Sequence, residues 1–326
     1  MGKYRRYSLE EREELSRGLS RGESLRQIAH RLGRHTSTLS REIGRNAGTP
    51  DLYRAVLAQG TAQTRRTIRK RKLEQHPRLR EYVFTKLALR WSPEQIAQVL
   101  RREFPRDEDM QISHEAIYTY LYVLPRGALK KMLIGYLRQK RRARRKRTGL
   151  KEQRGKITEM ISIEERPAEV AHRSVPGHWE GDLLMGKRHQ SALGTLVERK
   201  TRWLYLVPLK AKDASCVRKS FGKAITRLPK SLRKTMTYDQ GKEMAEHKLF
   251  TKETKVKVFF AHPGSPWERG TCENTNGLIR QFFPKGTDFN RVPLRQIRWA
   301  EKLLNERPRK ALGFMTPKEM ISGLLR

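Results

Sequence analysis

Apolar residues in the first part of the chain recur at the three- and four-residue spacing of amphipathic helices, and each run follows a polar capping residue. Ser8 opens SLEE and Ser24 opens SLRQ, and both have the Ser-x-x-Glu/Gln pattern of a capping box. Gly33 ends the second helix, and Thr36 is expected to cap a third helix over STLSREIGRN. The apolar stripe of the second helix consists of Leu25, Ile28, Ala29 and Leu32.

The helices on either side of Gly33 match the helix-turn-helix plan, in which a polar second helix enters the major groove of DNA. Leu39 and Ile43 are expected to face the core, which leaves a small polar and cationic outer face. The candidate DNA contacts on and just before this helix are Arg34, His35, Ser37, Thr38, Arg41 and Arg45. An ordinary three-helix bundle is the alternative, and the cationic outer face favours DNA binding.

A weaker copy of the same pattern lies further along the chain. Ser92 opens SPEQ, with a proline at the first helical position, and Ser113 precedes HEAIYTYLY. The intervening FPRDEDMQI is longer than a tight turn, so packing and base recognition both stay open for this pair. Between the two units, residues 52–77 are expected to be largely helical and very basic, a candidate contact for the DNA backbone.

Short runs typical of β-strands replace the helical spacing in the second half of the chain. Strands are expected at residues 179–185, 193–198, 203–208, 235–238 and 256–261. A helix with Asp213 as its N-cap should follow the third strand, and another should begin after Pro266. Three strands in succession, then a helix and a further strand, predict an α/β layer with a mixed sheet.

The formal net charge of this 326-residue chain is +38, which points to a class of partner. So large a cationic surplus is typical of nucleic-acid binding, with an anionic membrane surface as the competing partner. No run of eighteen apolar residues is present and MGKYRRYSLEERE lacks an apolar centre, so neither a membrane span nor a signal peptide is expected. The two cysteines, Cys216 and Cys272, are too few for a disulfide framework and lack zinc-site spacing, which favours a reducing, intracellular compartment.

Cationic residues are densest in RQKRRARRKR, at positions 138–147. Such a block cannot bury itself, so we expect a solvated linker or arm that becomes ordered on phosphates; a localisation-like tract or plain solubility is the alternative. Together with the periodicity, this block divides the chain into five parts. They are a helix-turn-helix domain at 1–48, a basic helical connector at 49–88, a second helix-turn-helix-like domain at 89–137, a basic linker at 138–173 and an α/β domain with C-terminal helices at 174–326.

Three acids carry the candidate chemistry: Asp182 in HWEGDLLMG, Asp239 in TYDQGKE and Glu273 in SPWERGTCENTNGLIRQFF. Asp182 lies mid-strand, where an unpaired carboxylate is costly, and Asp239 follows a strand, where a side chain can project into a site. Each acid alone also has a purely structural interpretation. Asp182 could be a buried acid with its hydrogen bonds satisfied, Asp239 a turn former and Glu273 a solvated helix residue. Together they predict a site for hard divalent cations, because carboxylates held close repel unless a cation lies among them. Two such ions form the usual clamp for attack on a phosphodiester.

The neighbours of these acids follow from strand and helix periodicity. His178 and Glu180 share the strand face of Asp182, where contacts with DNA or neighbouring side chains are expected and assistance to the metal is the alternative. Asn276 and Arg280 share the helical face of Glu273, which would present a metal ligand beside an amide and a cation.

The acidic segments resemble those of the insertion-sequence-30 family of bacterial transposases. The tail LNERPRKALGFMTPKEM and the segment SLRQIAHRLGRHTSTLSREIGRN resemble that family too, so the likeness covers nearly the whole chain. It implies an α+β multidomain protein, with N-terminal helix-turn-helix DNA-binding helices followed by a ribonuclease-H-like, retroviral-integrase-like α/β catalytic domain. It further implies that Asp182, Asp239 and Glu273 are the catalytic residues and the ligands of two Mg²⁺ ions per active site, for which Mn²⁺ can substitute. Arg280 stands where such enzymes often carry a basic residue, and Lys285 is a further candidate DNA contact.

The activity implied by the resemblance is that of a DDE transposase. Such an enzyme binds the terminal inverted repeats of an insertion sequence, cleaves a strand with Mg²⁺, and transfers the 3′-OH into target DNA. Expected partners are double-stranded DNA, as inverted repeats and target, and further copies of the chain in a homodimer or higher homo-oligomer, with no membrane. The expected location is the bacterial cytoplasm, in association with the nucleoid. One departure from the family is Glu268, where many relatives carry Gln.

Two other functions share parts of this pattern. A DNA-binding repressor with an inactive ribonuclease-H-like domain would need the cationic helix-turn-helix and not the three acids. A ribonuclease H or another structure-specific nuclease would share the catalytic fold, but would not explain tandem N-terminal DNA readers.

Overall fold

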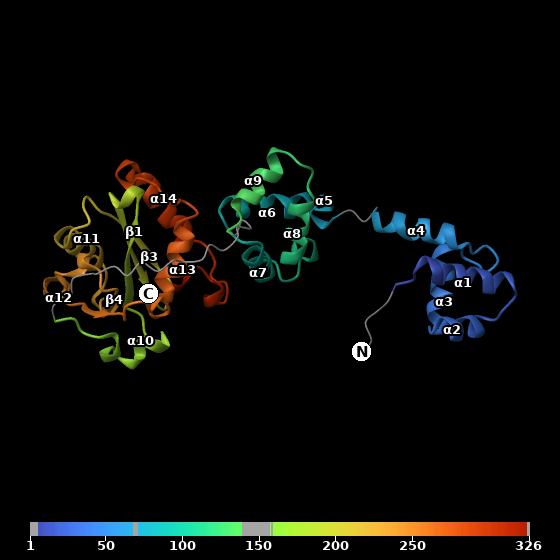
Figure 1. Ribbon diagram of the computed structural model, residues 1–326, viewed down its shortest axis with the longest axis horizontal. Coiled ribbons are helices and arrows are strands. Elements are labelled where there is room, and N and C mark those ends of the chain that lie inside the picture. Colours follow the sequence, from blue (N-terminus) through green and yellow to red (C-terminus); the bar gives the residue numbers. More distant parts are fainter. Residues whose placement is uncertain (1–5, 68–70, 139–156, 158, 325–326) are drawn as a thin grey trace. The chain divides into compact units, whose positions relative to one another are not determined.

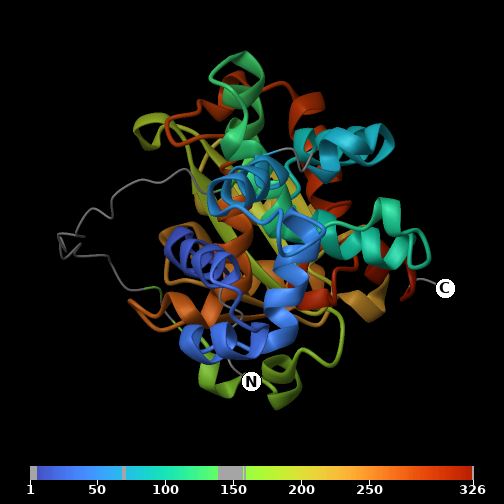
Figure 2. The same cartoon turned by 90° about the vertical axis from the view of Figure 1, so that its right-hand side faces the viewer.

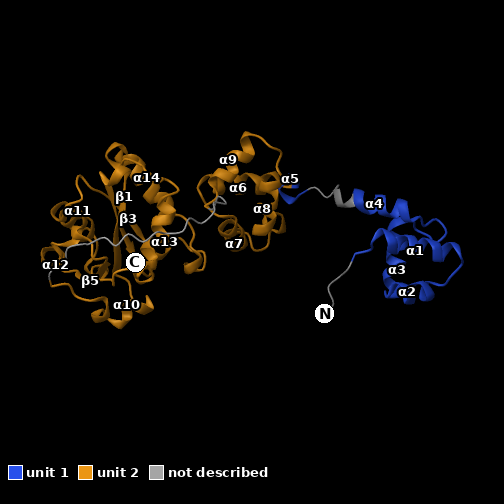
Figure 3. Cartoon of the chain, in the orientation of Figure 1, with its two compact units in different colours: residues 1–75 blue, residues 76–326 orange. Residues whose placement is uncertain are grey.

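The computed structural model describes residues 6–67, 71–138, 157 and 159–324. The chain forms two compact units, Met1–Gln75 and His76–Arg326 (Figure 3). Most of the cationic block predicted as a linker or arm, residues 139–147, lies outside the described residues. None of the helices in the described ranges is long and apolar enough to cross a membrane.

The first unit is helical, as the capping pattern predicts (Figures 1 and 2). Its helices are α1 (Leu9–Ser20), α2 (Leu25–Leu32), α3 (Thr36–Asn46), α4 (Ala55–Thr67) and α5 (Lys72–Gln75). Both predicted capping boxes are confirmed, at Ser8 and Ser24. Gly33 ends α2 with a φ of 59°, in the left-handed region that favours glycine. The small core contains Leu15, Ile28, Leu39, Ile43 and Tyr53.

The predicted cap of α3 is wrong by one residue. The N-cap is His35, whose Nδ1 accepts a hydrogen bond from the backbone N–H of Ser37 at 3.3 Å, and Thr36 is the first helical residue. An imidazole nitrogen thus does the work that a hydroxyl or carboxylate oxygen does at most helix starts. His35 is therefore fixed to the helix start on its Nδ1 side, while its ring stays exposed.

The second unit begins with a helical segment that contains the weaker predicted helix pair. Its helices are α6 (Pro77–Ala88), α7 (Pro93–Glu103), α8 (His114–Val123) and α9 (Ala128–Tyr136). The capping box at Ser92 and the cap at Ser113 are confirmed. The stretch between α7 and α8 contains a 3₁₀ turn, Glu108–Met110, capped by Asp107, so the two helices are not joined by a tight turn. A short helix, α10 (Ala168–His172), precedes the sheet.

A five-stranded mixed sheet forms the centre of the second unit. Its strands are β1 (His178–Met185), β2 (Ala192–Glu198), β3 (Leu204–Pro208), β4 (Thr235–Tyr238) and β5 (Lys257–Phe260). Their order is β3-β2-β1-β4-β5, with β1, β2 and β3 antiparallel and β1, β4 and β5 parallel. All five predicted strands are present, and each predicted boundary lies within one residue of the observed one.

Helices cover both faces of the sheet (Figure 1). On one face, α11 (Ala214–Thr226) and α12 (His247–Thr254) pack on a core that includes Trp179, Phe221 and Phe250. On the other face, α13 (Gly270–Ile279) and α14 (Leu294–Asn305) pack on a separate core with Leu184 and Leu278. Even-numbered residues of β1 therefore face α13, because strand side chains alternate. The chain ends with α15 (Pro317–Ser322).

Candidate active site and DNA-binding surface

Asp182 occupies an even-numbered position of β1, on the face that α13 covers. The Asn276 side chain of α13 donates a hydrogen bond from Nδ2 to the Asp182 Oδ2 atom at 2.8 Å. Gly181, beside it, faces the other side of the sheet, where a Cβ atom would lie 2.8 Å from the Tyr238 ring. A larger residue at this position would have to displace the buried Tyr238 side chain.

Asp239 follows the end of β4, beside Asp182. The register of the parallel pair aligns Glu180 with Thr237, and two residues further on each strand stand the two aspartates. Asp239 also forms the predicted turn, because its Oδ1 accepts a hydrogen bond from the backbone N–H of Gly241 at 3.3 Å. The sheet thus brings together two of the three predicted acids.

Arg269 lies between the two aspartates. Its Nη1 is 3.4 Å from Asp182 Oδ1, and its Nη2 is 3.2 Å from Asp239 Oδ2. Nη1 also donates a hydrogen bond to the backbone carbonyl of Gly181 at 3.2 Å. The guanidinium therefore serves as the cation that two neighbouring carboxylates require.

The charges of Asp182, Asp239 and Arg269 influence one another's pKa values. Burial raises the pKa of Asp182; Arg269 opposes that shift and Asp239 adds to it. For Arg269 burial opposes the charge, but Asp182 and Asp239 together raise the pKa of its guanidinium. An additional cation would therefore relieve the remaining cost of two carboxylates in a half-buried place.

Glu273 stands apart from this pair. Its side chain is exposed on α13, one turn before Asn276, so the helical face predicted for Glu273 and Asn276 is the one that faces Asp182. Within the described residues, no three His, Cys, Asp or Glu side chains lie close enough together to hold a metal ion. The structure therefore brings Asp182 and Asp239 together, and leaves Glu273 beside them without a contact to either.

The donor chemistry of the three acids fits a hard divalent cation. Asp182 and Asp239 offer carboxylate oxygens, the ligands that Mg²⁺ and Mn²⁺ prefer, and they already share one cationic partner in Arg269. Glu273 is close to this place along α13 and has no competing partner among the described side chains. The donor chemistry of these residues therefore fits a hard divalent cation, while the exposed Glu273 side chain lies outside the Asp182–Asp239 pair.

Glu180 has a role that strand alternation alone did not reveal. Its side chain is fully buried, with Oε1 paired to Arg199 and Oε2 accepting a hydrogen bond of 2.7 Å from the backbone N–H of Cys272. It therefore fixes the first turn of α13, the helix that carries Glu273. The expected contact with neighbouring side chains is confirmed by Arg199. His178, two residues earlier, is also buried, and its Nδ1 lies 2.8 Å from the Thr235 Oγ1 atom.

Of the two predicted DNA contacts beyond Glu273, the structure holds one in internal hydrogen bonds. Arg280 donates from Nη2 to the carbonyl of Met185 at 2.8 Å, at the end of β1, and from Nη1 to the carbonyls of Phe283 and Pro284. Lys285 is exposed. Arg280 thus links the ends of β1 and α13, which is a structural use of the cation predicted on that helical face.

The candidate DNA contacts of the first unit separate into a largely buried arginine, Arg34, and five more accessible side chains. Arg34 is largely buried, with Nη2 2.9 Å from a Glu11 carboxylate oxygen, and its guanidinium stacks over the Tyr7 ring. This pairing withdraws it from the outer face. His35, Arg41 and Arg45 are exposed, and Ser37 and Thr38 are partly exposed, so these five side chains lie on an accessible helical surface.

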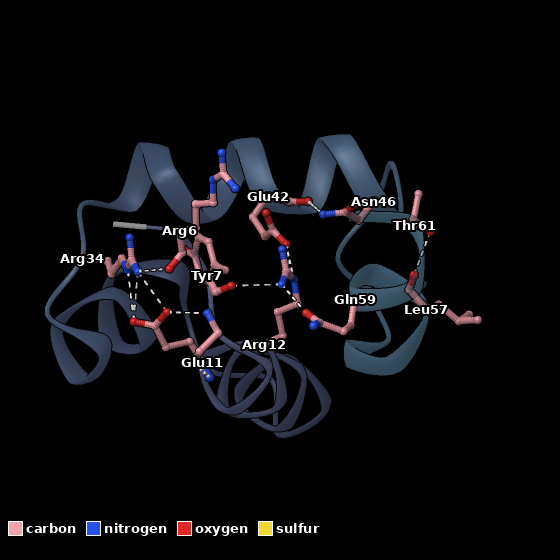
Figure 4. A network of polar contacts seen from close by, with 11 residues as sticks. Arg6, Tyr7, Glu11, Arg12, Arg34, Glu42, Asn46, Leu57, Gln59 and Thr61 are labelled. Carbon is pink, nitrogen blue, oxygen red and sulfur yellow. Dashed lines mark hydrogen bonds and ion pairs between the residues drawn. The ribbon is translucent and has the colours of Figure 1, made fainter. Parts of the chain in front are cut away.

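A buried polar network holds this surface in place (Figure 4). Arg12 of α1 pairs with Glu42 of α3 at 2.7 Å, and it also donates to the Gln59 side chain of α4 at 2.5 Å. The pair is almost fully buried, so neither partner could lose the other without leaving an unpaired charge in the core. The network therefore sets the position of α3 against two other helices.

Known protein families match a part of each unit. A helix-turn-helix domain family matches residues 3–46, and an integrase core domain family matches residues 172–266. The chain is 43% identical over 326 residues to the transposase for insertion sequence element IS1086 of Cupriavidus metallidurans, covering 99% of this chain and 96% of that protein. It is 44% identical over 320 residues to the transposase InsI for insertion sequence element IS30A of Escherichia coli, covering 96% and 82% respectively. It is 38% identical over 303 residues to the transposase for insertion sequence element IS4351 of Bacteroides fragilis, covering 93% and 91%.

Proposed function

Because this chain belongs to the insertion-sequence-30 family of transposases, we propose that Asp182, Asp239 and Glu273 are the catalytic carboxylates of its DNA cleavage and strand-transfer activity. The helix-turn-helix makes the chain a DNA-binding protein, and the integrase core makes it a DDE transposase with a ribonuclease-H-like catalytic domain. The observation that best supports the residue assignment is the convergence of Asp182 and Asp239 on one cation, Arg269.

Enzymes of this class generally use divalent metals, and we propose two Mg²⁺ ions, or Mn²⁺ in their place, held by the three carboxylates. Such ions activate an attacking hydroxyl and stabilise the leaving oxygen of a phosphodiester. Glu273 would have to approach the two aspartates to complete this set, since its side chain is exposed in the structure. Arg269 would then give up its place between Asp182 and Asp239 or share it.

The remaining residues of the site act by positioning. Asn276 holds Asp182 Oδ2 with a donated hydrogen bond, which restricts the rotation of the carboxylate. Glu180 fixes the start of α13 and thereby the place from which Glu273 projects. Strand cleavage at a transposon end would expose a 3′-OH, which then attacks a target phosphodiester in line. No covalent enzyme–DNA intermediate is required.

We further propose that α3 reads the terminal inverted repeats through its exposed side chains, and that the catalytic domain contacts mostly target and donor backbone. Two element ends must be brought together, so the working form is proposed to be at least a homodimer. The proposed location is the bacterial cytoplasm, with the nucleoid. The five-part division of the chain at residues 48, 88, 137 and 173 likewise remains our proposal.

A product assay tests this function against the two alternatives. Purified full-length chain is incubated with duplex DNA that carries an inverted repeat, with a target plasmid, and with or without Mg²⁺. We expect metal-dependent joining of the 3′-OH ends to the plasmid. Binding without cleavage would instead favour an inactive repressor, and hydrolysis without any joined product would favour a nuclease.

A further inference from the structure

The second unit contains a cavity of about 580 Å³ whose lining is strongly cationic. Its wall brings together six cations from four separate segments of the chain. They are Arg138, Arg173, Arg202, Arg307, Arg309 and Lys310. The acid in the lining is Glu94, and it is paired with Lys310 at 2.6 Å. Five arginines therefore face one cavity around a single, already neutralised carboxylate.

The deepest of these arginines have neutral partners. Arg307 is 2% exposed and donates to the side-chain oxygens of Gln95 at 3.0 Å and Gln281 at 2.6 Å. Arg309 is 8% exposed and donates from Nη2 to the carbonyl of Leu304 at 2.8 Å. The buried Nε of Arg309 has no hydrogen-bond partner within the described part of the chain. Across those same residues, no carboxylate lies within ion-pair distance of either arginine.

Burial of like charges is costly, and this cost lowers the pKa values of the arginines. Burial is the main cause and the neighbouring guanidinium groups add to it; together they lower the pKa of Arg307 to about 9 and that of Arg309 to about 10. Burial likewise lowers the pKa of Arg202 to about 10. All three remain protonated at neutral pH. A cluster of this kind is stabilised by an anion that is not part of the chain.

We infer that this cavity binds a phosphodiester group of the DNA backbone, at a second site on the far side of α13 from the catalytic acids. Arginine forks match phosphate oxygens in geometry as well as charge. Ser92 lines the cavity at the start of α7, so the positive end of an eleven-residue helix adds to the field. The inference rests on the proposed function, because it takes DNA as the substrate.

The position of α13 favours DNA over a free anion. Glu273 and Asn276 lie on one flank of this helix, whereas Thr271, Asn274 and Leu278 line the cavity on another. A helix is about 10 Å across, and a DNA strand advances about 3.4 Å per nucleotide. The cavity would therefore hold the backbone roughly three nucleotides from the phosphate at the catalytic acids.

The test measures DNA affinity without catalysis. The full-length chain is titrated with a fluorescent duplex carrying an inverted repeat, in chelator and at several salt concentrations, and anisotropy gives the dissociation constant. Arg202→Gln combined with Arg309→Gln should weaken binding about tenfold and reduce the salt slope by about one to two. The matched control, Lys248→Gln combined with Lys252→Gln, removes two cations from α12 on the opposite face of the sheet and should change affinity less than twofold.

Folding is checked on the same proteins by thermal unfolding. Loss of two crowded charges should leave the unfolding temperature of the free Arg202→Gln/Arg309→Gln chain unchanged or higher. If that chain fails to fold, the variant Arg138→Gln/Arg202→Gln replaces it. This variant keeps the buried Arg309 and changes the exposed Arg138 instead, and the same loss of affinity is expected.

Two results would overturn the inference. One is DNA affinity and salt slope equal to those of the control. The other combines two measurements: the variant binds DNA as tightly as the wild type, but inorganic phosphate raises the unfolding temperature of the wild type and not that of the variant. This result would assign the cavity to a free anion. Because no metal is present, neither result depends on whether the three acids are catalytic.

Discussion

The Nδ2 group of Asn276 lies 2.8 Å from the Oδ2 atom of Asp182, and this hydrogen bond connects α13 directly to the central strand of the sheet. It does so one helical turn from Glu273. The contact therefore fixes both the rotation of a strand carboxylate and the face that the helix presents to it.

Replacing Asn276 with alanine should slow strand cleavage about 10- to 100-fold, because Asp182 would lose the donor that orients it. The free energy of unfolding should fall by only about 1 kcal/mol. Single-turnover cleavage of an inverted-repeat duplex and urea denaturation measure the two effects. Gln296→Ala, an exposed amide on α14, serves as the control. Equal rates for the two variants would remove Asn276 from the site.

Replacing Arg269 with glutamine should make the protein depend on a divalent cation for stability. Asp182 and Asp239 would then repel without a cation between them, and the metal-free free energy of unfolding should fall by about 1–2 kcal/mol, less than for a fully buried pair. Calorimetry with chelator and with Mg²⁺ should show a larger metal-induced rise in unfolding temperature for the variant than for the wild type. The same rise in both proteins would contradict the bridging role.

Replacing Glu180 with alanine should destabilise the catalytic domain by about 3–5 kcal/mol, because Arg199 would remain buried without its partner and Cys272 would lose its backbone acceptor. Urea unfolding monitored by tryptophan fluorescence measures this loss. Glu306→Ala removes the partly exposed partner of Lys318 and should change stability by less than about 1 kcal/mol. A small effect at Glu180 would mean that α13 is held by packing alone.

Arg41 and Arg34 should behave differently although both stand in the predicted recognition region. Arg41→Ala should weaken inverted-repeat binding by about 1–3 kcal/mol and leave folding intact, because the side chain is exposed. Arg34→Ala should instead lower the unfolding temperature of the first unit, because Glu11 and Tyr7 lose their partner. Mobility-shift titrations and thermal unfolding of both variants separate these outcomes. A binding defect at Arg34 with unchanged stability would restore it to the recognition surface.

Local patterns were enough to predict most elements of the fold. The capping boxes at Ser8, Ser24 and Ser92, and the strand runs around Asp182 and Asp239, depend on neighbours in sequence, so they can be identified without the tertiary structure. The cap of α3 was missed because a histidine side chain, rather than Thr36, accepts the hydrogen bond from Ser37. Both residues are polar and adjacent, so the sequence alone does not show which of them is the N-cap.

The sequence predicted the acids of the site and the helical face that carries Asn276, but not the other contacts. Arg269 is one of 72 lysines and arginines, and nothing in SPWERG distinguishes the cation that meets two carboxylates. The bond from the Cys272 backbone to Glu180 involves an N–H group that every residue except proline has. The arginines of the second cavity come from segments up to about 170 residues apart, so their meeting is a product of the tertiary fold alone.

The most direct test of the account compares catalysis and binding in three single variants: Asp182→Asn, Asp239→Asn and Glu273→Gln. Mg²⁺-dependent cleavage and joining of an inverted-repeat duplex are measured beside DNA affinity in chelator, with Asp288→Asn as the control. Each of the three variants should lose at least about 100-fold in cleavage rate while DNA affinity stays within about twofold of the wild type. Cleavage at the control rate by any one of them, and by Glu273→Gln above all, would contradict the assignment of these three carboxylates.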